Sequence, residues 1–231
     1  MSFRATLRHR FEPYRAEVAG IVTQVESGVD PQSIDGYIDS GADSDVFRLA
    51  SNPEIVARLP YGDSMGYRES LERQYVQALV PGRERAGLEQ IVAFSGIRRL
   101  PAVLSRHAAG PTFRQLDETA RERISGTRFA GLVAIWQNMH DVNLAPDWGT
   151  HNIIFPPNSI TLIDYTLDPS KTLTDTAAEF AGGDMLLERT YYKDPVPSYG
   201  LLFRDVCADI LGGDAAAAIE AAWQNQGFTR F

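Results

Sequence analysis

The chain has 231 residues, a formal net charge of −8 at pH 7 and a single cysteine, Cys207. The acidic balance excludes broad binding to nucleic acids or anionic membranes, because phosphate groups require a basic protein face. One cysteine excludes an intrachain disulfide framework and a cysteine-based zinc site. The opening residues lack the apolar run of a signal peptide, and no segment is apolar over a membrane-spanning length. We therefore expect a cytoplasmic protein with a sizeable core, in one compact unit or two small lobes.

The first predicted element is an amphipathic helix. Apolar residues recur at helical spacing: Phe11, Tyr14, Val18, Ile21, Val22 and Val25. Proline is favoured in the first turn of a helix, so we expect this helix to begin near Pro13. It would form a helical extension, residues 1–29, that packs onto the part of the chain that follows.

Strands are predicted next, in two places that carry polar residues of interest. The segment 37–49 has the pattern of strand, turn and strand, with Gly41 in the turn and Ser44 soon after it. Residues 54–60 form a third strand, which carries Arg58. Glycine in a turn lets main-chain N–H groups approach phosphate oxygens with no Cβ in the way. Taken alone, however, an ordinary β-turn and a surface arginine of a strand explain these residues better.

A helix, two strands and a polar run lead into the second half of the chain. Residues 67–79 have apolar side chains at helical spacing, with Glu72 on the neighbouring face and Glu69 one turn earlier. The two strands are expected over 90–94 and 101–104, and the polar run covers 105–110. The polar run contains Ser105 and His107, and a long helix over 124–140 follows it.

The most informative residues come after that helix: Asp147, Asn152 and Asp164. Asn152 and Asp164 are separated by an apolar run, a turn and a second apolar run, which predicts a β-hairpin that would bring both to one ion. Transfer of a γ-phosphoryl group needs a carboxylate that orients the acceptor hydroxyl, and oxygen ligands for Mg²⁺. Asp147 suits the first task and the other two suit the second. Taken alone, such a triplet is more often a set of loop residues, because Asp and Asn cap helices and mimic turns.

Beyond this hairpin the sequence predicts no further motif. Residues 167–175 are expected to form polar loops, and helices are expected near 200–211 and 215–225.

Taken in this order, the motifs resemble those of the protein-kinase-like superfamily, nearest to its aminoglycoside-phosphotransferase-like branch and the small atypical kinases. The resemblance spans residues 37–166. It implies an α+β, two-lobed protein-kinase-like fold, with a small β-rich amino lobe and a mainly helical carboxy lobe. The implied domains are 30–106 for the amino lobe, which would bind nucleotide, and 107–231 for the carboxy lobe.

The resemblance also implies a role for each candidate residue. Asp147 corresponds to the catalytic base, and Asn152 and Asp164 correspond to the Mg²⁺ ligands. The ATP-binding positions correspond to Gly41 and Ser44 in the glycine-rich loop, Arg58 in the third strand and Glu72 in the next helix. In the hinge between the lobes they correspond to Ser105 and His107. Glu72 would hold the phosphate-binding cation in place, and Gly110 matches the glycine that the family has just beyond the hinge.

Several positions depart from the family pattern. Arg58 stands where the family has lysine, and Ala145 stands where the catalytic loop has histidine. The triplet Asp164-Tyr165-Thr166 replaces Asp-Phe-Gly. No Ala-Pro-Glu signature follows, which argues against an ordinary eukaryotic-type protein kinase.

Three functions remain open at this point. The leading one is an ATP- and Mg²⁺-dependent phosphotransferase, whose partner is an unidentified hydroxyl-bearing small molecule or protein. The short section after Asp164 favours a small acceptor pocket or a protein acceptor. The second function is a pseudokinase that acts as a nucleotide-binding or scaffolding module. The third is an α+β domain of another function, for which the resemblance is accidental.

Overall fold

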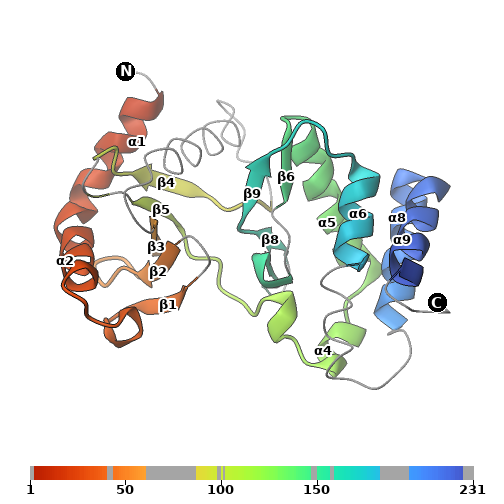
Figure 1. The fold of residues 1–231 in the computed structure, drawn as a ribbon, viewed down its shortest axis with the longest axis horizontal. Helices are drawn as coiled ribbons and strands as arrows, with labels where there is room; N and C mark the ends of the chain where they lie inside the picture. The colour runs from red at the N-terminus through yellow and green to blue at the C-terminus, as the bar shows by residue number, and fades with distance from the viewer. Residues whose placement is uncertain are drawn as a thin grey trace. The chain divides into compact units, whose positions relative to one another are not determined.

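The computed structural model describes residues 3–40, 44–60, 87–97, 100, 102–146, 150–156, 159–182 and 198–225. The chain divides into two compact units. The first unit is formed by Met1–Gly82 and Glu89–His107, and the second by Arg83–Leu88 and Ala108–Phe231. In Figure 1 the first unit runs from red to yellow, and the second is mainly green and blue.

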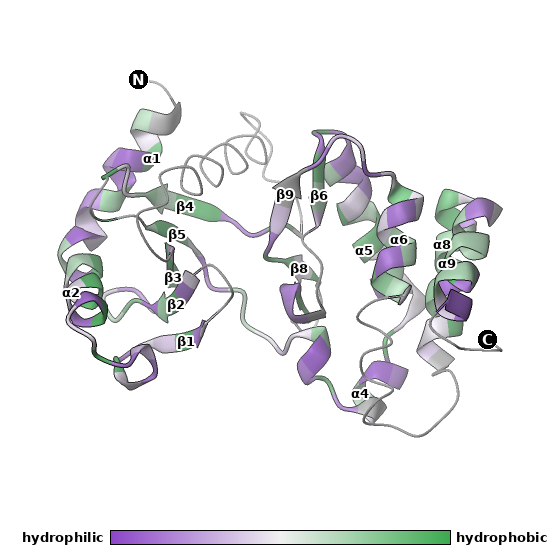
Figure 2. Ribbon diagram, in the orientation of Figure 1, coloured by the Kyte–Doolittle hydropathy of each residue, from purple (hydrophilic) through white to green (hydrophobic). Residues whose placement is uncertain are grey.

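The first unit contains an antiparallel five-stranded sheet with the strand order β1-β2-β3-β5-β4. The strands are β1 (Tyr37–Ser40), β2 (Ser44–Arg48), β3 (Ile55–Pro60), β4 (Ile91–Phe94) and β5 (Val103–Arg106). All five strands were expected from the sequence, but β5 continues to Arg106 instead of ending near residue 104. Figure 2 shows β4 as hydrophobic along its whole length, and three of its four residues are buried.

Two helices precede this sheet: α1 (Phe3–Phe11) and α2 (Arg15–Glu26), joined by a 3-10 turn over Glu12–Tyr14. The helix expected to begin near Pro13 is α2, which begins at Arg15 directly after this turn, so that prediction is confirmed, whereas α1 was not predicted. Pro13 lies at the start of the 3-10 turn, where a residue without a main-chain N–H is tolerated. The first helix is anchored by Leu7 and Phe11, which are both buried, although most of its other residues are polar.

Helices dominate the second unit. They are α4 (Glu118–Glu122), α5 (Gly126–His140), α6 (Leu173–Gly182), α8 (Ser198–Leu211) and α9 (Gly213–Asn225). The expectation of polar loops over 167–175 was wrong at both ends, because a strand reaches Leu167 and α6 begins at Leu173. None of the helices in the described residues has the length and hydropathy needed to span a bilayer.

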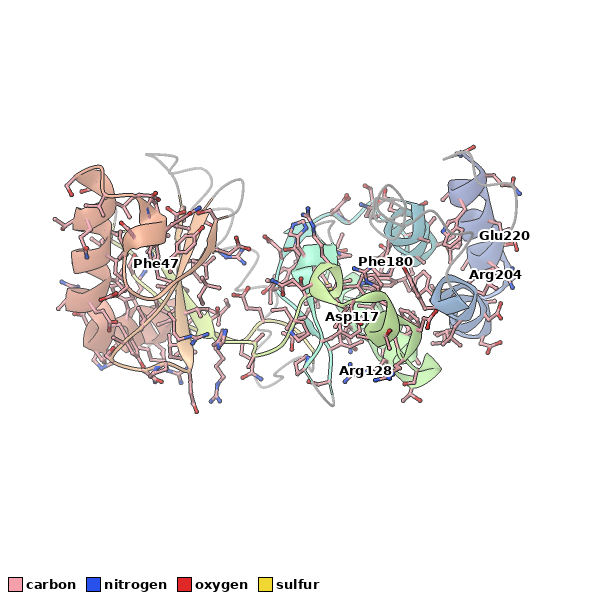
Figure 3. The ribbon with its side chains drawn as sticks, turned by 90° about the horizontal axis from the view of Figure 1, so that it is seen from below. Phe47, Asp117, Arg128, Phe180, Arg204 and Glu220 are labelled. Atoms are coloured by element: carbon pink, nitrogen blue, oxygen red, sulfur yellow. The ribbon has the colours of Figure 1, made fainter. Side chains whose placement is uncertain are left out.

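An aromatic cluster forms the centre of this helical core. Phe180 of α6 has its ring centroid 5.1 Å from that of Phe203 on α8 and 5.7 Å from that of Trp136 on α5, both in edge-to-face geometry. Such pairs stabilise a core beyond the area that they bury. Figure 3 shows Phe180 in this core, and Arg204 of α8 close to Glu220 of α9, with Nη1 3.0 Å from Oε1.

Cys207 also lies in this core, on α8. Burial raises the pKa of its thiol to about 12, because a low-dielectric surrounding disfavours the thiolate. The cysteine is therefore a small apolar core residue and no nucleophile.

Two short antiparallel ladders complete the second unit. In one, β6 (Leu144–Pro146) pairs with β9 (Tyr165–Leu167), and in the other β7 (Ile153–Ile154) pairs with β8 (Thr161–Leu162). A 3-10 turn over Thr150–Asn152 leads into β7. Asn152 directly precedes β7, and Asp164 lies between β8 and β9.

Candidate functional site

The β7–β8 hairpin brings Asn152 and Asp164 close together along the backbone. Ile153 pairs with Leu162, and the N–H of Ile163 donates a 3.0 Å hydrogen bond to the main-chain oxygen of Asn152. Asn152 is thus opposite the neighbour of Asp164 in the ladder. The hairpin predicted from the sequence is confirmed.

Asp164 lies where the hairpin passes into the second ladder. Its Oδ1 accepts a 3.0 Å hydrogen bond from the N–H of Tyr165, the first residue of β9. Tyr165 pairs in turn with Pro146, which is the last described residue before Asp147 in the sequence. Asp147, the predicted catalytic base, lies outside the described residues.

The chemistry of Asn152 and Asp164 fits a magnesium ion. Carboxylate and amide oxygens are hard ligands, and Mg²⁺ is commonly bound through one or two protein groups, several waters and substrate phosphates. Asn152 is buried and Asp164 is half-buried, so both side chains are held by packing. Within the described ranges no group of three or more His, Cys, Asp or Glu could hold a metal by itself.

Gly110, near the start of the second unit, packs closely against the residues that follow β7. A Cβ at this position would lie 2.9 Å from the main-chain nitrogen of Pro156, and the φ angle of Gly110 is +152°. Next to it, the N–H of Phe155 donates a 2.8 Å hydrogen bond to the oxygen of Pro111. Only glycine fits such a close approach of two main chains. Gly110 is therefore required by its close contact with Phe155 and Pro156, which follow β7.

In the first unit, Arg58 lies on the sheet face opposite the hydrophobic core. Successive side chains of a strand point to opposite faces. Ala57 and Leu59 of β3 belong to the core cluster together with Val18 of α2. Arg58, between them, therefore points to the other face, where its side chain is only 10% exposed.

Ser44 and Ser105 share this face with Arg58. In the ladder between β2 and β3, Val46 pairs with Arg58, and Ser44 is two positions before Val46. In the ladder between β3 and β5, Ser105 pairs with Val56, which is two positions before Arg58. Three of the predicted ATP-binding residues are therefore brought onto one face by the register of the sheet.

The described partner of Arg58 is a residue that sequence reasoning missed. Arg58 Nη2 lies 3.9 Å from Oε2 of Glu89, and both side chains are buried. Glu72, the partner expected from the sequence, lies outside the described residues, as does Gly41. Glu89 precedes the predicted strand 90–94 directly, but no spacing rule connects it with Arg58.

His107 is integrated into the sheet through its main chain. Its N–H donates a 2.7 Å hydrogen bond to the oxygen of Glu54, so this N–H is engaged and does not face a ligand. The side-chain Nε2 lies 3.3 Å from Nη2 of Arg48. A guanidinium only donates, so Nε2 is the nitrogen without a proton. Burial, and secondly the charge of Arg48, lower the pKa of His107 from its ordinary value.

No protein-family model matches the chain, and no curated protein matches its sequence. Solved structures of aminoglycoside phosphotransferases do match its fold. The ternary complex of APH(2″)-IIa with streptomycin and ATP has a TM-score of 0.56 and 14% identity, over 90% of this chain and 89% of that chain.

Two further structures give the same result. ADP-bound APH(2″)-Ib has a TM-score of 0.55 and 14% identity, over 90% of this chain and 87% of that chain. The gentamicin complex of APH(2″)-IIa has a TM-score of 0.57 and 13% identity, over 88% and 86% of the two chains. The chain has a protein-kinase-like fold of the aminoglycoside-phosphotransferase type.

This result confirms the predicted α+β, two-lobed kinase-like fold. The kinase-like fold also accounts for the five-stranded antiparallel sheet of the first unit and the helices of the second. The roles of the individual site residues stay predictions.

Proposed function

We propose that the protein is an ATP- and Mg²⁺-dependent phosphotransferase, which moves the γ-phosphoryl group of ATP to a hydroxyl of a small molecule or a protein. The observation that supports this most is the β7–β8 hairpin, because it places Asn152 one ladder position from Asp164. Amide and carboxylate oxygens suit Mg²⁺, which neutralises the phosphate charge during transfer.

In this proposal the two lobes have different tasks, nucleotide binding and metal binding. The amino lobe, residues 30–106, binds the nucleotide, and its sheet face with Ser44, Arg58 and Ser105 contacts it. Arg58 contributes a permanent positive charge for the phosphate oxygens. The carboxy lobe, residues 107–231, holds Mg²⁺ through Asn152 and Asp164.

Asp147 acts on the acceptor. Its carboxylate orients the attacking hydroxyl and accepts the proton as the bond to phosphorus forms. Gly41 and Glu72 keep their predicted roles, in the phosphate-binding loop and as a partner of the phosphate-binding cation.

The acceptor is a molecule with a hydroxyl group. The solved structures that match the fold include complexes of other proteins with streptomycin and gentamicin. The net charge of −8 would favour a cationic acceptor over an anionic one. Because ATP is abundant in the cytoplasm, we also propose a cytoplasmic location.

One experiment tests the reaction directly. The purified chain is incubated with ATP labelled in the γ-phosphoryl group, Mg²⁺ and fractionated cell extract, and label transfer is measured. We expect transfer with the parent, and its loss in Asp147→Asn and Asp164→Asn. Asp168→Asn is the matched control, because Asp168 is an aspartate just after β9 whose carboxylate accepts local hydrogen bonds from Ser170. Transfer that survives both site substitutions would refute the proposal.

A pseudokinase is the second candidate, and Ala145 favours it. Ala145 is buried in β6, paired with Thr166, where the family pattern has histidine. Metal-dependent ATP binding without transfer to any fraction would support this candidate instead. Absence of ATP binding would exclude the phosphotransferase and would favour a scaffolding module that binds no nucleotide.

A further inference from the structure

The surroundings of Arg58 contain a carboxylate that the kinase-like pattern does not assign. Arg58 is 10% exposed and Glu89 is 6% exposed at the side chain, and their charged groups are 3.9 Å apart. A buried guanidinium is costly without an opposite charge, and a buried carboxylate is costly for the same reason. Each charge therefore offsets part of the cost of burying the other within the first unit.

The register of the sheet explains how Glu89 reaches Arg58. Glu89 precedes Gln90, whose main-chain oxygen accepts a 2.9 Å hydrogen bond from the N–H of Arg106 at the end of β5. This bond extends the β4–β5 ladder by one position and fixes the backbone next to Glu89. The ion pair then crosses the intervening strand β5, from β3 to the segment that leads into β4.

We propose that Glu89 is a positioning residue, which holds the Arg58 guanidinium on the nucleotide-facing side of the sheet and orients it for the phosphates of ATP. This inference rests on the function proposed above. It assigns the task to a carboxylate next to β4, whereas the sequence pattern assigns it to Glu72.

The geometry of the pair suits positioning more than neutralisation. A guanidinium carries its five N–H donors in a planar fork, and a carboxylate beside one terminal nitrogen sets the orientation of that fork. At 3.9 Å the two groups attract each other without a tight hydrogen bond. Buried ion pairs add little to stability in general, so a role in orientation explains this one better.

The test compares three isosteric substitutions: Glu89→Gln, Glu72→Gln and Glu54→Gln. Glu54 is an exposed glutamate at the start of β3 in the same unit, so it serves as the matched control. For each variant, the affinities for ATP with Mg²⁺ and for adenosine are measured by calorimetry. We expect Glu89→Gln to weaken ATP binding roughly 10-fold, as for directly interacting groups. Adenosine binding should stay at the parental value, because adenosine has no phosphate for Arg58.

A double-mutant cycle shows whether Glu89 acts through Arg58. In an Arg58→Gln background, we expect Glu89→Gln to cause no further loss of ATP affinity. If Glu89→Gln does not fold, Glu89→Asp replaces it, because it keeps the charge on a shorter side chain, and we expect an intermediate loss of ATP affinity. Independent, additive losses in the cycle would overturn the proposal.

Other outcomes are equally decisive. Parental ATP affinity in Glu89→Gln, or equal weakening of ATP and adenosine, would show that Glu89 has no positioning role. A gain in ATP affinity would show that Glu89 withholds Arg58 from the phosphates. If the parent itself binds no Mg·ATP, the proposed function fails and this inference falls with it, whereas the outcomes above refute the inference alone.

Discussion

The main-chain oxygen of Asn152 accepts a 3.0 Å hydrogen bond from the N–H of Ile163, the residue before Asp164. This bond closes the base of the β7–β8 hairpin and fixes the backbone positions from which the two oxygen-bearing side chains extend. The hairpin thus fixes the backbone of both candidate metal ligands.

Replacement of Asp164 should remove metal-dependent stabilisation by ATP while the fold is kept. In the parent, ATP should raise the melting temperature more with Mg²⁺ or Mn²⁺ than with a chelator, because a ligand stabilises the state that binds it. At an ATP concentration 100 times the Kd, this linkage amounts to about 2.7 kcal/mol. Asp164→Asn should lose the metal-dependent part of the shift in thermal denaturation. Equal shifts with metal and with chelator in the parent would contradict the assignment of the ligands.

Asp147→Asn should affect turnover and spare binding. If Asp147 orients the acceptor hydroxyl and accepts its proton, its loss should reduce turnover by ~10²–10⁴, as for other positioned general bases. Mg·ATP affinity should remain near the parental value, since the base contacts the acceptor. Phosphoryl transfer or ATPase turnover, measured beside Mg·ATP affinity, checks this. A variant that loses binding would place Asp147 among the nucleotide contacts instead.

Gly110→Ala should destabilise the protein. The added Cβ would lie 2.9 Å from a main-chain nitrogen, which cannot move away as a flexible side chain can. We expect a loss of roughly 1–3 kcal/mol in the free energy of unfolding, the range for overpacked sites. Gly131→Ala is the matched control, because Gly131 lies within α5 and a Cβ there meets nothing within 4 Å. That control should gain about 0.5–1 kcal/mol. Denaturant titration that gives both variants the same sign would contradict the argument.

The hairpin and the sheet could be predicted from the sequence because their signals are local. Apolar runs on both sides of a proline-containing turn predict β7 and β8, and strand patterns bounded by turn residues predict the strands of the first unit. The partnership of Arg58 with Glu89 could not be predicted in this way. It depends on which strands are neighbours in the sheet, and β4 and β3 are separated by β5.

Of the described helices, α1, α4 and α6 were not predicted, and for α1 and α6 the reason is related. In α1 the buried residues are Leu7 and Phe11 among polar residues, too few to produce a clear helical pattern. In α6 the start is marked by a capping arrangement of Thr172 and Asp175, which reads as a polar loop when the hydrogen bonds are unknown.

Thr172→Ala should weaken the start of α6. The hydroxyl of Thr172 accepts a 3.0 Å hydrogen bond from the N–H of Asp175, and the carboxylate of Asp175 accepts one from the N–H of Thr172. We expect a loss of about 1 kcal/mol, typical of a removed cap. Thr172→Ser keeps the hydroxyl and should stay near the parental stability in denaturant titration. The same loss in both variants would show that the methyl group, not the cap, is responsible.

The contact between His107 and Arg48 should make stability depend on pH on the acid side of neutrality. Burial, then the positive charge of Arg48, lower the pKa of His107 in the folded state below the ordinary value of 6.5. The unfolded chain then binds more protons than the folded one between the two pKa values, so stability should rise with pH across this window and level off above about 6.5.

The variants His107→Gln and Arg48→Gln test the origin of this dependence. His107→Gln should abolish the contribution of this site to the pH dependence of stability. Arg48→Gln should reduce that contribution only in part, because burial is the larger cause of the lowered pKa and remains in this variant. The measurement is the free energy of unfolding between pH 5 and 8, compared as differences from the parent so that other titrating groups cancel. A parental pH profile in His107→Gln would show that His107 titrates alike in both states.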